Sequence, residues 1–275
     1  MPELPEIEVV CRGLAPHLKN RVIAGVWYSG KKLRHDFDLE LAKKTIINQE
    51  VISVKRRARY LVIQIGRHSL VVHLGMTGNL GIFPAASKKL RHTHIILTLD
   101  NDMELRFSDT RRFGSVQLFE NSSFESLEQT FFQKFGPEPF DAECTPYYLH
   151  EKAKKRKIAV KNLIMDNQII TGTGNIYANE SLFQAGIKPG RKACSITLRE
   201  WEKLHQAIVE ILLWAIDCGG STISDFIDAS GSKGYFQANF RVYGRAKQPC
   251  PNCNTPITSE KIGGRSSFYC RKCQK

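Results

Sequence analysis

The sequence predicts an α+β protein of more than one domain, in which a β-sandwich comes first, a helical part second and a small metal-binding segment last. Short segments rich in β-branched and aromatic residues fill the first half. Apolar residues at helical spacing dominate the second half, and two Cys-x-x-Cys pairs lie near the end. A chain of 275 residues is long enough for two domains and a proper hydrophobic core.

The first part of the chain opens with a helix, expected over residues 6–19, where apolar residues recur at helical spacing. Strands are expected over residues 22–28, 60–65, 69–74, 93–99, 103–107 and 115–119. Asp100, Asn101 and Asp102 tolerate turn conformations and predict a hairpin between two of these strands. Many short strands at close spacing are typical of a β-sandwich or barrel of roughly 130 residues. We therefore bound an N-terminal β-sandwich domain at residues 1–134.

The composition changes at residues 135–139, where two prolines and a glycine indicate an interdomain linker, bounded at 135–150. Beyond it, helices are expected over residues 146–157, 159–166, 176–185, 197–216 and 222–228. The best formed is 197–216, because Thr197 and Glu200 make a capping-box pattern at its start. Its apolar stripe indicates packing and comprises Trp201, Leu204, Ile208, Leu212 and Ala215. A helical domain is bounded at 151–240.

The charge balance points to a polyanionic partner. The chain has 40 Lys and Arg against 27 Asp and Glu, a net charge of +13, and such a surplus is typical of nucleic-acid binding. No apolar run approaches the roughly 20 residues of a membrane span, and no signal peptide is recognisable. We therefore expect no membrane partner and a reducing, cytoplasmic location, where the eight cysteines would not form disulfides.

The last segment, bounded at 241–275, has the spacing of a zinc site. Cys250 and Cys253 are followed after sixteen residues by Cys270 and Cys273. Four thiolates on two tight turns surround one tetrahedral Zn²⁺, whereas the alternative of two disulfides does not suit a reducing compartment. Because all four positions are filled by sulfur, the ion is structural, and it would supply folding energy to a segment too short for a core of its own.

The N-terminus carries a candidate nucleophile. Removal of Met1 would leave Pro2 with a free secondary amine, and α-amines have pKa values of about 7.7–8.0 against about 10.4 for lysine. Such an amine attacks an aldehyde-like carbon to give a cationic iminium, an electron sink. Glu3 or Glu6 could then move protons. The alternative interpretation is an ordinary helix start, because proline and acidic residues suit that position.

Four further segments are compatible with contacts to DNA. Gly172 and Gly174 precede a helix and leave backbone N–H groups for an anion, although an ordinary helix–turn–helix corner explains them equally well. The segment Lys261-Ile-Gly-Gly-Arg265 indicates a hairpin tip that offers a cation to a phosphate or a solvated turn. Two cationic runs, residues 55–59 and 152–157, indicate either phosphate contact or a solvated face.

Two glycine-flanked motifs contain residues suited to entering a base stack. His73-Leu-Gly-Met-Thr-Gly78 follows a strand and could present Met76 outward, and the segment Asp109-Thr-Arg-Arg-Phe-Gly114 pairs cations with an aromatic ring. Met and Phe fill a gap between bases, and Arg takes the place of a displaced base. Taken alone, a motif of either kind is more often core packing or an ordinary loop than a DNA contact.

Together these motifs resemble the formamidopyrimidine-DNA glycosylase family of bacterial repair enzymes. The resemblance runs from MPELPE through HLGMTG, DTRRFG, TGTGNIYANESLF, GGSTISDF and GYFQANFRVYGR to the final cysteine pairs. It implies an N-terminal β-sandwich, a helix–two-turns–helix DNA-binding domain and a zinc finger. It also implies removal of oxidised purines, formamidopyrimidines and 8-oxoguanine, from damaged double-stranded DNA near the nucleoid. One flipped base needs only one subunit, so a monomer is expected.

The resemblance implies individual roles. Pro2 would attack C1′ of the damaged nucleotide, Glu3 would donate the proton, and Glu6 would support the site. Strand cleavage by β,δ-elimination would follow, with Arg265 as a proton donor in the last step. The residues implied to contact DNA are Met76, Arg111 and Phe113 inside the duplex, and Asn175, Arg265, His92 and Arg156 on its backbone. A loop near residues 230–235 would close over the extruded base.

One departure from the family pattern concerns catalysis. Arg59 stands where the family usually has Lys, and Arg stays charged and does not readily donate a proton. The preference among lesions or the elimination rate is therefore expected to differ. A second departure, Thr110 in place of Pro, is expected to matter little.

Two rival functions remain open. One is the sister endonuclease family for oxidised pyrimidines, against which Leu4 and the long segment of residues 219–243 argue. The other is a non-catalytic zinc-finger DNA-binding protein, which would use the basic charge and the cysteines. Such a protein has no use for an N-terminal Pro-Glu pair.

Overall fold

The computed structural model describes residues 2–220 and 240–275. The chain forms two compact units. The first, here the sandwich unit, comprises residues 1–133 and 219–235, and the second, the helix–finger unit, comprises residues 134–218 and 236–275. The finer division of the chain at residues 134, 150 and 240 stays a prediction.

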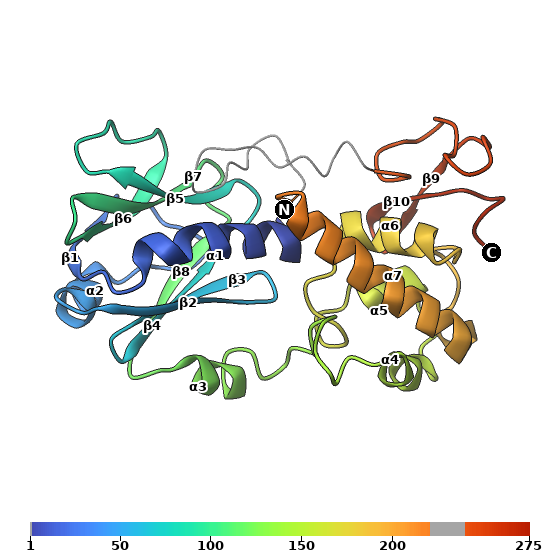
Figure 1. The fold of residues 1–275 in the computed structure, drawn as a ribbon, viewed down its shortest axis with the longest axis horizontal. Helices are drawn as coiled ribbons and strands as arrows, with labels where there is room; N and C mark the ends of the chain where they lie inside the picture. The colour runs from blue at the N-terminus through green and yellow to red at the C-terminus, as the bar shows by residue number, and fades with distance from the viewer. Residues whose placement is uncertain (1, 221–239) are drawn as a thin grey trace. The chain divides into compact units, whose positions relative to one another are not determined.

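The sandwich unit contains two antiparallel sheets of four strands each, so the predicted β-sandwich is confirmed (Figure 1). One sheet has the order β1-β6-β7-β5 and the other the order β2-β3-β4-β8. The strands are β1 (Ile23–Tyr28), β2 (Val51–Arg57), β3 (Tyr60–Ile65), β4 (His68–His73), β5 (Gly78–Pro84), β6 (Thr93–Leu99), β7 (Met103–Asp109) and β8 (Ser115–Phe119). The expected hairpin at residues 100–102 joins β6 to β7.

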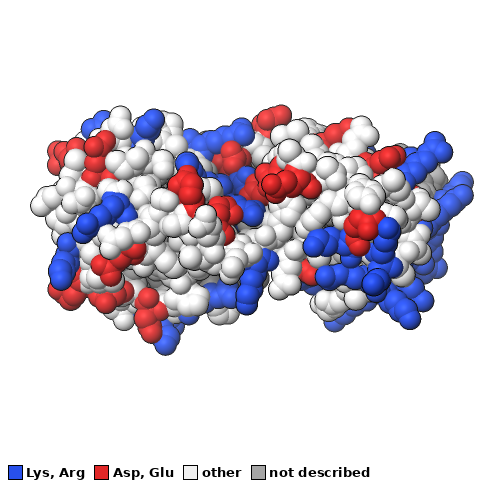
Figure 2. Space-filling view, turned by 90° about the horizontal axis from the view of Figure 1, so that it is seen from below, with Lys and Arg blue, Asp and Glu red and all other residues white. Residues whose placement is uncertain are grey.

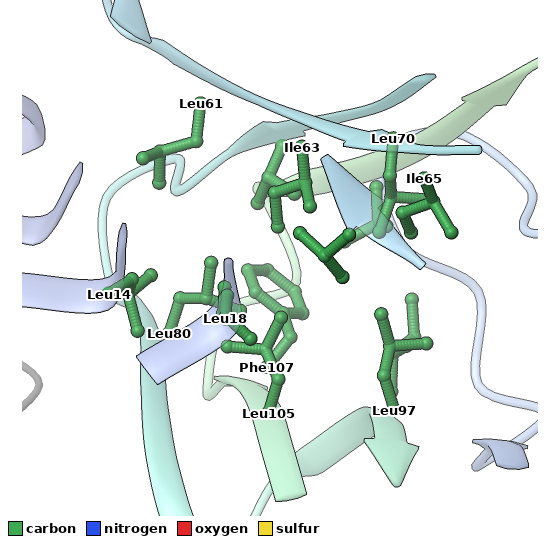
Figure 3. Packing of buried hydrophobic residues seen from close by; sticks show 14 of the residues in the cluster. Leu14, Leu18, Leu61, Ile63, Ile65, Leu70, Leu80, Leu97, Leu105 and Phe107 are labelled. Atoms are coloured by element: carbon green, nitrogen blue, oxygen red, sulfur yellow. The ribbon is translucent and has the colours of Figure 1, made fainter. Parts of the chain in front are cut away.

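Leucine and isoleucine side chains from both sheets and from the first helix fill the interior of the sandwich. Figure 3 shows Leu14 and Leu18 of helix α1 (Leu4–Leu18) beside side chains of β3, β5 and β7. Both leucines are fully buried. Burial of this apolar surface, at about 25 cal/mol per Å², fixes α1 against the sandwich and so positions the residues at its N-terminus.

Helix α1 begins two residues before the expected start at residue 6. Glu3 is its N-cap and forms a capping box with Glu6, so the first turn is stabilised from residue 4 onward. The structure also contains two short helices in this unit that the apolar periodicity did not indicate, α2 (Leu39–Ile46) and α3 (Phe124–Gln129).

The helix–finger unit contains the expected helices, with some shorter than predicted. They are α4 (Pro146–Ala153), α5 (Val160–Ile164), α6 (Asn175–Gln184) and α7 (Leu198–Asp217). A short 3₁₀ turn that was not predicted, η1 (Ala193–Ser195), precedes α7. The capping box of Thr197 and Glu200 is confirmed, and the predicted stripe of α7 is buried. Helix α4 ends before residue 157, where consecutive like charges disfavour a further turn. The helix expected over residues 222–228 lies outside the described residues.

The finger adds a two-stranded hairpin, β9 (Thr258–Ile262) and β10 (Arg265–Tyr269), to this unit. Gly263 and Gly264 connect the strands with φ values of 58° and 76°, a turn for which glycine is preferred. The hairpin tip predicted at residues 261–265 is therefore confirmed. Within the described residues, no helix has the length and apolar character needed to cross a membrane.

Candidate functional site

The N-terminal residues of the sandwich unit form a buried, preorganised cluster. Pro2 is buried, and Glu3 and Glu6 are 3% and 0% exposed. The backbone N–H of Glu3 donates to Glu6 Oε2 at 2.7 Å. Glu6 thus holds the backbone of the residue that follows Pro2. The two interpretations of the N-terminus, an ordinary helix start and a reactive amine, are therefore compatible. The carboxylate of Glu6 caps the helix and also fixes the backbone next to Pro2.

A distant part of the chain returns to this cluster. Gly220 has φ of +80°, and a Cβ added there would lie 3.3 Å from Glu6 Cγ and 3.4 Å from its Cα. A larger residue would be tight against the helix start as well as strained in its backbone. The chain after α7 therefore passes directly beside the first turn of α1. The loop implied to close over an extruded base, near residues 230–235, lies outside the described residues.

Met76 and Phe113 lie on two neighbouring loops of the sandwich unit. Met76 is 42% exposed and Phe113 is 48% exposed, which is high for large apolar side chains in a structured loop. The guanidinium of Arg111 lies 4.5 Å from the centre of the Phe113 ring. With Arg34, His73, Gly75 and Arg112, the two apolar side chains line a pocket of about 310 Å³. The structure thus brings together the three residues that the resemblance placed inside the duplex.

The close approach of these loops depends on glycine. Gly75 has φ of +66°, and a Cβ there would lie 2.5 Å from the backbone N of Gly114 and 2.6 Å from the carbonyl C of Phe113. A Cβ on Gly114 would lie 2.8 Å from the carbonyl oxygen of His73. Contacts this short with backbone atoms cannot be relieved by a side-chain rotation, so both positions require glycine.

Arg59 and His73 lie near each other at one end of the second sheet. Arg59 is in the β2–β3 turn and is only 9% exposed, so it is not a surface cation as its run of charges indicated. Burial, and then the charges of Arg34 and Arg59, lower the pKa of His73 to about 4. His73 is therefore neutral at pH 7, and its Nδ1 accepts from the backbone N–H of Gly75 at 3.1 Å, which leaves Nε2 as the donor.

Sequence reasoning missed Arg34 and His73 as members of the site. His73 opens the HLGMTG motif, so its place beside Met76 was a signal that could have been used. Arg34 belongs to no motif, and only the fold brings it to the pocket.

The other cations of residues 55–59 each pair with a glutamate of the same unit. Arg56 Nε lies 2.7 Å from Glu8, Arg57 Nε lies 2.8 Å from Glu128, and Lys55 pairs with Glu125 at 3.7 Å. The side chains of Arg56 and Arg57 are largely buried in these ion pairs, which argues against phosphate contacts by these two residues. The pair of Lys55 is exposed and worth little, so a phosphate contact by Lys55 stays a prediction. All three belong to a strand whose charges are matched by acidic residues elsewhere in the unit.

His92 lies beside a second pocket of the same unit. This pocket has a volume of about 400 Å³ and is lined in part by Arg91, His92 and Arg111. The carbonyl of His92, which has φ of 66°, accepts from the backbone N–H of Asp109 at 3.0 Å. His92 is therefore fixed beside exposed arginines, an environment that suits a phosphate.

Asn175 and Arg265 lie close together in the helix–finger unit. Asn175 is the first residue of α6, immediately after Gly174, and its Nδ2 donates to the carbonyl of Ser266 at 3.2 Å. The buried ammonium of Lys161 donates to the same carbonyl at 2.9 Å. Because Ser266 follows Arg265, these bonds hold the exposed arginine at the hairpin tip next to the N-terminus of α6.

Arg156 occupies a different part of this unit. It follows α4, its side chain is 41% exposed, and its Nη1 lies 3.6 Å from Asp166. A contact with DNA would have to compete with this ion pair, which is worth little at an exposed position. Figure 2 shows Lys and Arg side chains gathered on the helix–finger unit. The run of residues 152–157 begins in the last turn of α4 and continues beyond its end.

The four cysteines of the finger fit a zinc ion. Their sulfur atoms all lie within 4.8 Å of one another, with Cys253 and Cys270 at 3.4 Å and Cys250 and Cys273 at 3.9 Å. Tetrahedral Zn–S bonds of about 2.3 Å place sulfurs about 3.8 Å apart. Cys250 and Cys270 are buried against Phe183 of α6 and Val242, so the ion would join the finger to the helices.

Three protein-family profiles match consecutive parts of the chain. Residues 1–116 match the formamidopyrimidine-DNA glycosylase N-terminal domain, and residues 135–227 match the H2TH domain of the same enzymes. Residues 247–275 match a zinc finger found in FPG and IleRS. The sandwich, the helical region and the finger described above thus each correspond to a known protein-family domain.

Full-length relatives show the same relationship. The formamidopyrimidine-DNA glycosylase of Acidithiobacillus ferrooxidans is 40% identical over 275 residues and covers all of both chains. That of Vibrio atlanticus is 43% identical over 274 residues, with complete coverage of both chains. The solved structure of the Lactococcus lactis FPG in complex with a Fapy-dG containing DNA superposes with a TM-score of 0.90, at 29% identity, and the match covers 99% of this chain and 100% of that one.

The three matched parts, together with the four-cysteine centre, define a DNA glycosylase of base-excision repair that carries a structural zinc finger. Within that class, the chain belongs to the formamidopyrimidine-DNA glycosylase family.

Proposed function

We propose that this enzyme removes formamidopyrimidines and 8-oxoguanine from duplex DNA through a covalent bond to Pro2 and then cuts the damaged strand. The observation that carries the proposal is the N-terminal cluster, in which Pro2 is buried and the Glu3 backbone is held by Glu6 at 2.7 Å. A nucleophile gains most from a fixed position, and here the capping box supplies it.

The proposed reaction begins when the amine of Pro2, freed by removal of Met1, attacks C1′ of the damaged nucleotide. The C1′–N bond breaks, and Glu3 gives its proton to the departing base. Glu3 then takes the N–H proton of Pro2 and passes it to O4′, so the C1′–O4′ bond breaks, the sugar ring opens and an iminium is left between Pro2 and C1′. Its positive charge acidifies the C2′ protons, so the 3′ phosphate leaves by β-elimination. A second elimination, in which the guanidinium of Arg265 donates hydrogen bonds to the departing phosphate, releases the 5′ phosphate and leaves a one-nucleotide gap.

We assign the exposed side chains of the sandwich unit to the duplex itself. Met76 and Phe113 would fill the space left by the extruded nucleotide, and Arg111 would face the unpaired base. Their exposure and the cation–π contact of Arg111 with Phe113 support this assignment. Backbone contacts are assigned to His92, Asn175, Arg265 and Arg156. We further propose that the enzyme acts as a monomer on damaged double-stranded DNA at the nucleoid in the cytoplasm.

Borohydride trapping tests the covalent step. The wild-type protein, incubated with duplex DNA containing 8-oxoguanine opposite cytosine, should be reduced to a covalent complex through Pro2. A protein that retains Met1 should lose trapping and keep DNA binding, and the Pro2→Gly variant, whose primary amine still forms an imine, should be trapped far more slowly than the wild type. The mass of the mature protein reports the loss of Met1 and, under native conditions, one zinc ion.

Two outcomes would contradict the proposal. Binding of damaged DNA without any trapping by the wild-type protein would favour a non-catalytic DNA-binding protein. Much faster excision of an oxidised pyrimidine opposite guanine than of an oxidised purine opposite cytosine would favour the sister endonuclease family.

A further inference from the structure

We propose that Asp109 is a positioning residue that joins the loops of Met76, Arg111 and Phe113 into one rigid wedge. The inference rests on the proposed function, because it assigns these three side chains to the duplex. The wedge is defined here as Met76, Arg111 and Phe113. Asp109 touches none of the reacting atoms in this proposal and acts through the two loops that carry the wedge.

The carboxylate of Asp109 is fully buried and lies at the end of β7. Its Oδ1 accepts from the hydroxyl of Thr77 at 2.5 Å and from the backbone N–H of Arg111 at 3.2 Å. Its Oδ2 accepts from the backbone N–H of Gly114 at 2.8 Å. Thr77 directly follows Met76, and Gly114 directly follows Phe113. The third donor is the backbone of Arg111 itself, so the carboxylate of Asp109 contacts the chain at or next to every member of the wedge.

Thr77 is the bridge between the two loops. Its Oγ1 donates to Asp109 and also accepts from the backbone N–H of Arg111 at 3.1 Å. The Met76 loop and the Arg111 loop are therefore joined by one hydroxyl as well as by the carboxylate. Gly75 brings the same loops into backbone contact at Gly114, so the hydrogen bonds and the packing impose the same arrangement.

The backbone of Asp109 is held from the opposite side. His94 Nε2 lies 2.9 Å from the carbonyl oxygen of Asp109, and His94 Nδ1 lies 3.0 Å from Ser29 Oγ. Since a carbonyl only accepts, Nε2 carries the proton and Ser29 donates to Nδ1. Burial lowers the pKa of His94, which favours this neutral form. Asp109 is thus fixed through both its side chain and its main chain.

A rigid wedge has a specific advantage in this reaction. Met76 and Phe113 are exposed before DNA binds, and insertion between bases requires them to hold their position against restacking. Loops that become ordered only when DNA binds pay a cost in conformational entropy, which weakens the affinity for DNA. Preorganised loops avoid this cost. A buried carboxylate is costly unless it is hydrogen-bonded. The donors identified for Asp109 all belong to the two loops that carry the wedge.

Substitutions at Thr77 separate positioning from folding. Thr77→Val keeps the shape of the side chain and removes the hydroxyl that joins the loops, whereas Thr77→Ser keeps the hydroxyl. Thr77→Val should slow single-turnover excision of 8-oxoguanine from duplex DNA about tenfold, the size of one charge-assisted hydrogen bond. Thr77→Ser should remain within about twofold of the wild-type rate.

A fluorescent reporter measures the wedge directly. 2-Aminopurine placed opposite the lesion brightens when it is unstacked, and the Glu3→Gln background, which lacks the proposed proton donor, allows insertion to be observed without base release. Thr77→Val in that background should reduce the fluorescence rise, and Thr77→Ser should restore it. Asp109→Asn is a second variant, since its amide N–H₂ would face the N–H of Gly114 instead of accepting from it. It should show the same loss.

Cleavage of an abasic site in single-stranded DNA is the matched control, because that substrate has no complementary base for a wedge to displace. Thr77→Val should cut it at the wild-type rate. Equal losses on both substrates, an unchanged fluorescence rise, or a Thr77→Ser protein as slow as Thr77→Val would overturn the inference. Failure of the wild-type protein to be trapped on the single-stranded substrate would instead contradict the role of Pro2.

Discussion

His73 shows how burial at a single residue changes a titration. Its pKa is lowered to about 4 by burial and by the charges of Arg34 and Arg59, whereas an unfolded histidine titrates near 6.5. As the pH falls below about 6.5, His73 binds a proton in the unfolded state but not in the folded state. This contribution to stability is therefore complete above the unfolded pKa and is lost as the pH falls towards 4.

The prediction for His73 follows from that sign. Between pH 7 and pH 5, the free energy of unfolding of the wild-type protein should fall by about 2 kcal/mol through this group alone. His73→Gln should remove that part of the fall. Urea unfolding at the two pH values measures it, and the difference between the two proteins should be constant above pH 7. Equal losses in both proteins would contradict the role assigned to burial at His73.

At this scale the sequence indicated the candidate residues that stand in a recognisable motif, whether buried like Glu3 and Glu6 or exposed like Met76. Met76, Phe113 and Arg265 stand in glycine-flanked motifs, and the structure places them outward as expected. Asp109 and Arg34 could not be assigned in the same way. Their importance depends on which loops lie beside them, and that information arises only from the pairing of the strands.

Among the structural elements, the two glycine loops offer the sharpest prediction. Gly75→Ala and Gly30→Ala both place a side chain at positive φ, +66° and +72°, which costs about 1–2 kcal/mol. A Cβ at Gly75 also lies 2.5 Å from backbone N of Gly114, whereas nothing lies within 4 Å at Gly30. Gly75→Ala should therefore be the more destabilising and should also weaken binding to lesion-containing duplex.

Chemical unfolding and DNA titration of the two variants measure this difference. Gly30→Ala is the matched control, because it carries the same backbone strain in the same unit. If the two alanine variants lose equal stability and equal affinity, the close packing of the loops does not support the site.

Sequence reasoning missed two strands of the sandwich unit, β2 and β5, because the local residue preferences of both disfavour a strand. β2 ends in Lys55, Arg56 and Arg57, a pattern typical of a solvated run, and its charges are matched only by glutamates from other elements. β5 contains Gly78 and Gly81 and ends at Pro84, which disfavour a strand by local preference. It lies at the edge of its sheet, where such residues are tolerated. Helices with strong caps or long stripes, such as α7, were predicted well.

For the molecule as a whole, the zinc ion should act as a folding element of one unit only. Removal of the metal by a chelator, or Cys270→Ser, should release the finger and with it the hairpin that carries Arg265, because metal binding supplies the folding energy of so small a segment. The sandwich core contains none of the four cysteines. A cooperative thermal transition should therefore remain, while affinity for damaged DNA falls and returns when zinc is added.

Metal content by native mass spectrometry, followed by calorimetry and DNA binding of the same samples, measures this separation. Full affinity of the metal-free protein would show that the finger does not contribute to DNA binding. Loss of every thermal transition would show that the sandwich also depends on the ion.

The return of Gly220 to the first turn of α1 has a consequence for modularity. The sandwich unit is discontinuous along the chain, since residues beyond α7 belong to it again. A protease cut between residues 133 and 134 would therefore not release an autonomous sandwich fragment, because a piece needed beside Glu6 would remain on the other product. The two units therefore cannot be exchanged between related genes by a single crossover. Recombination between residues 133 and 134 should yield a chimera with an incomplete N-terminal cluster.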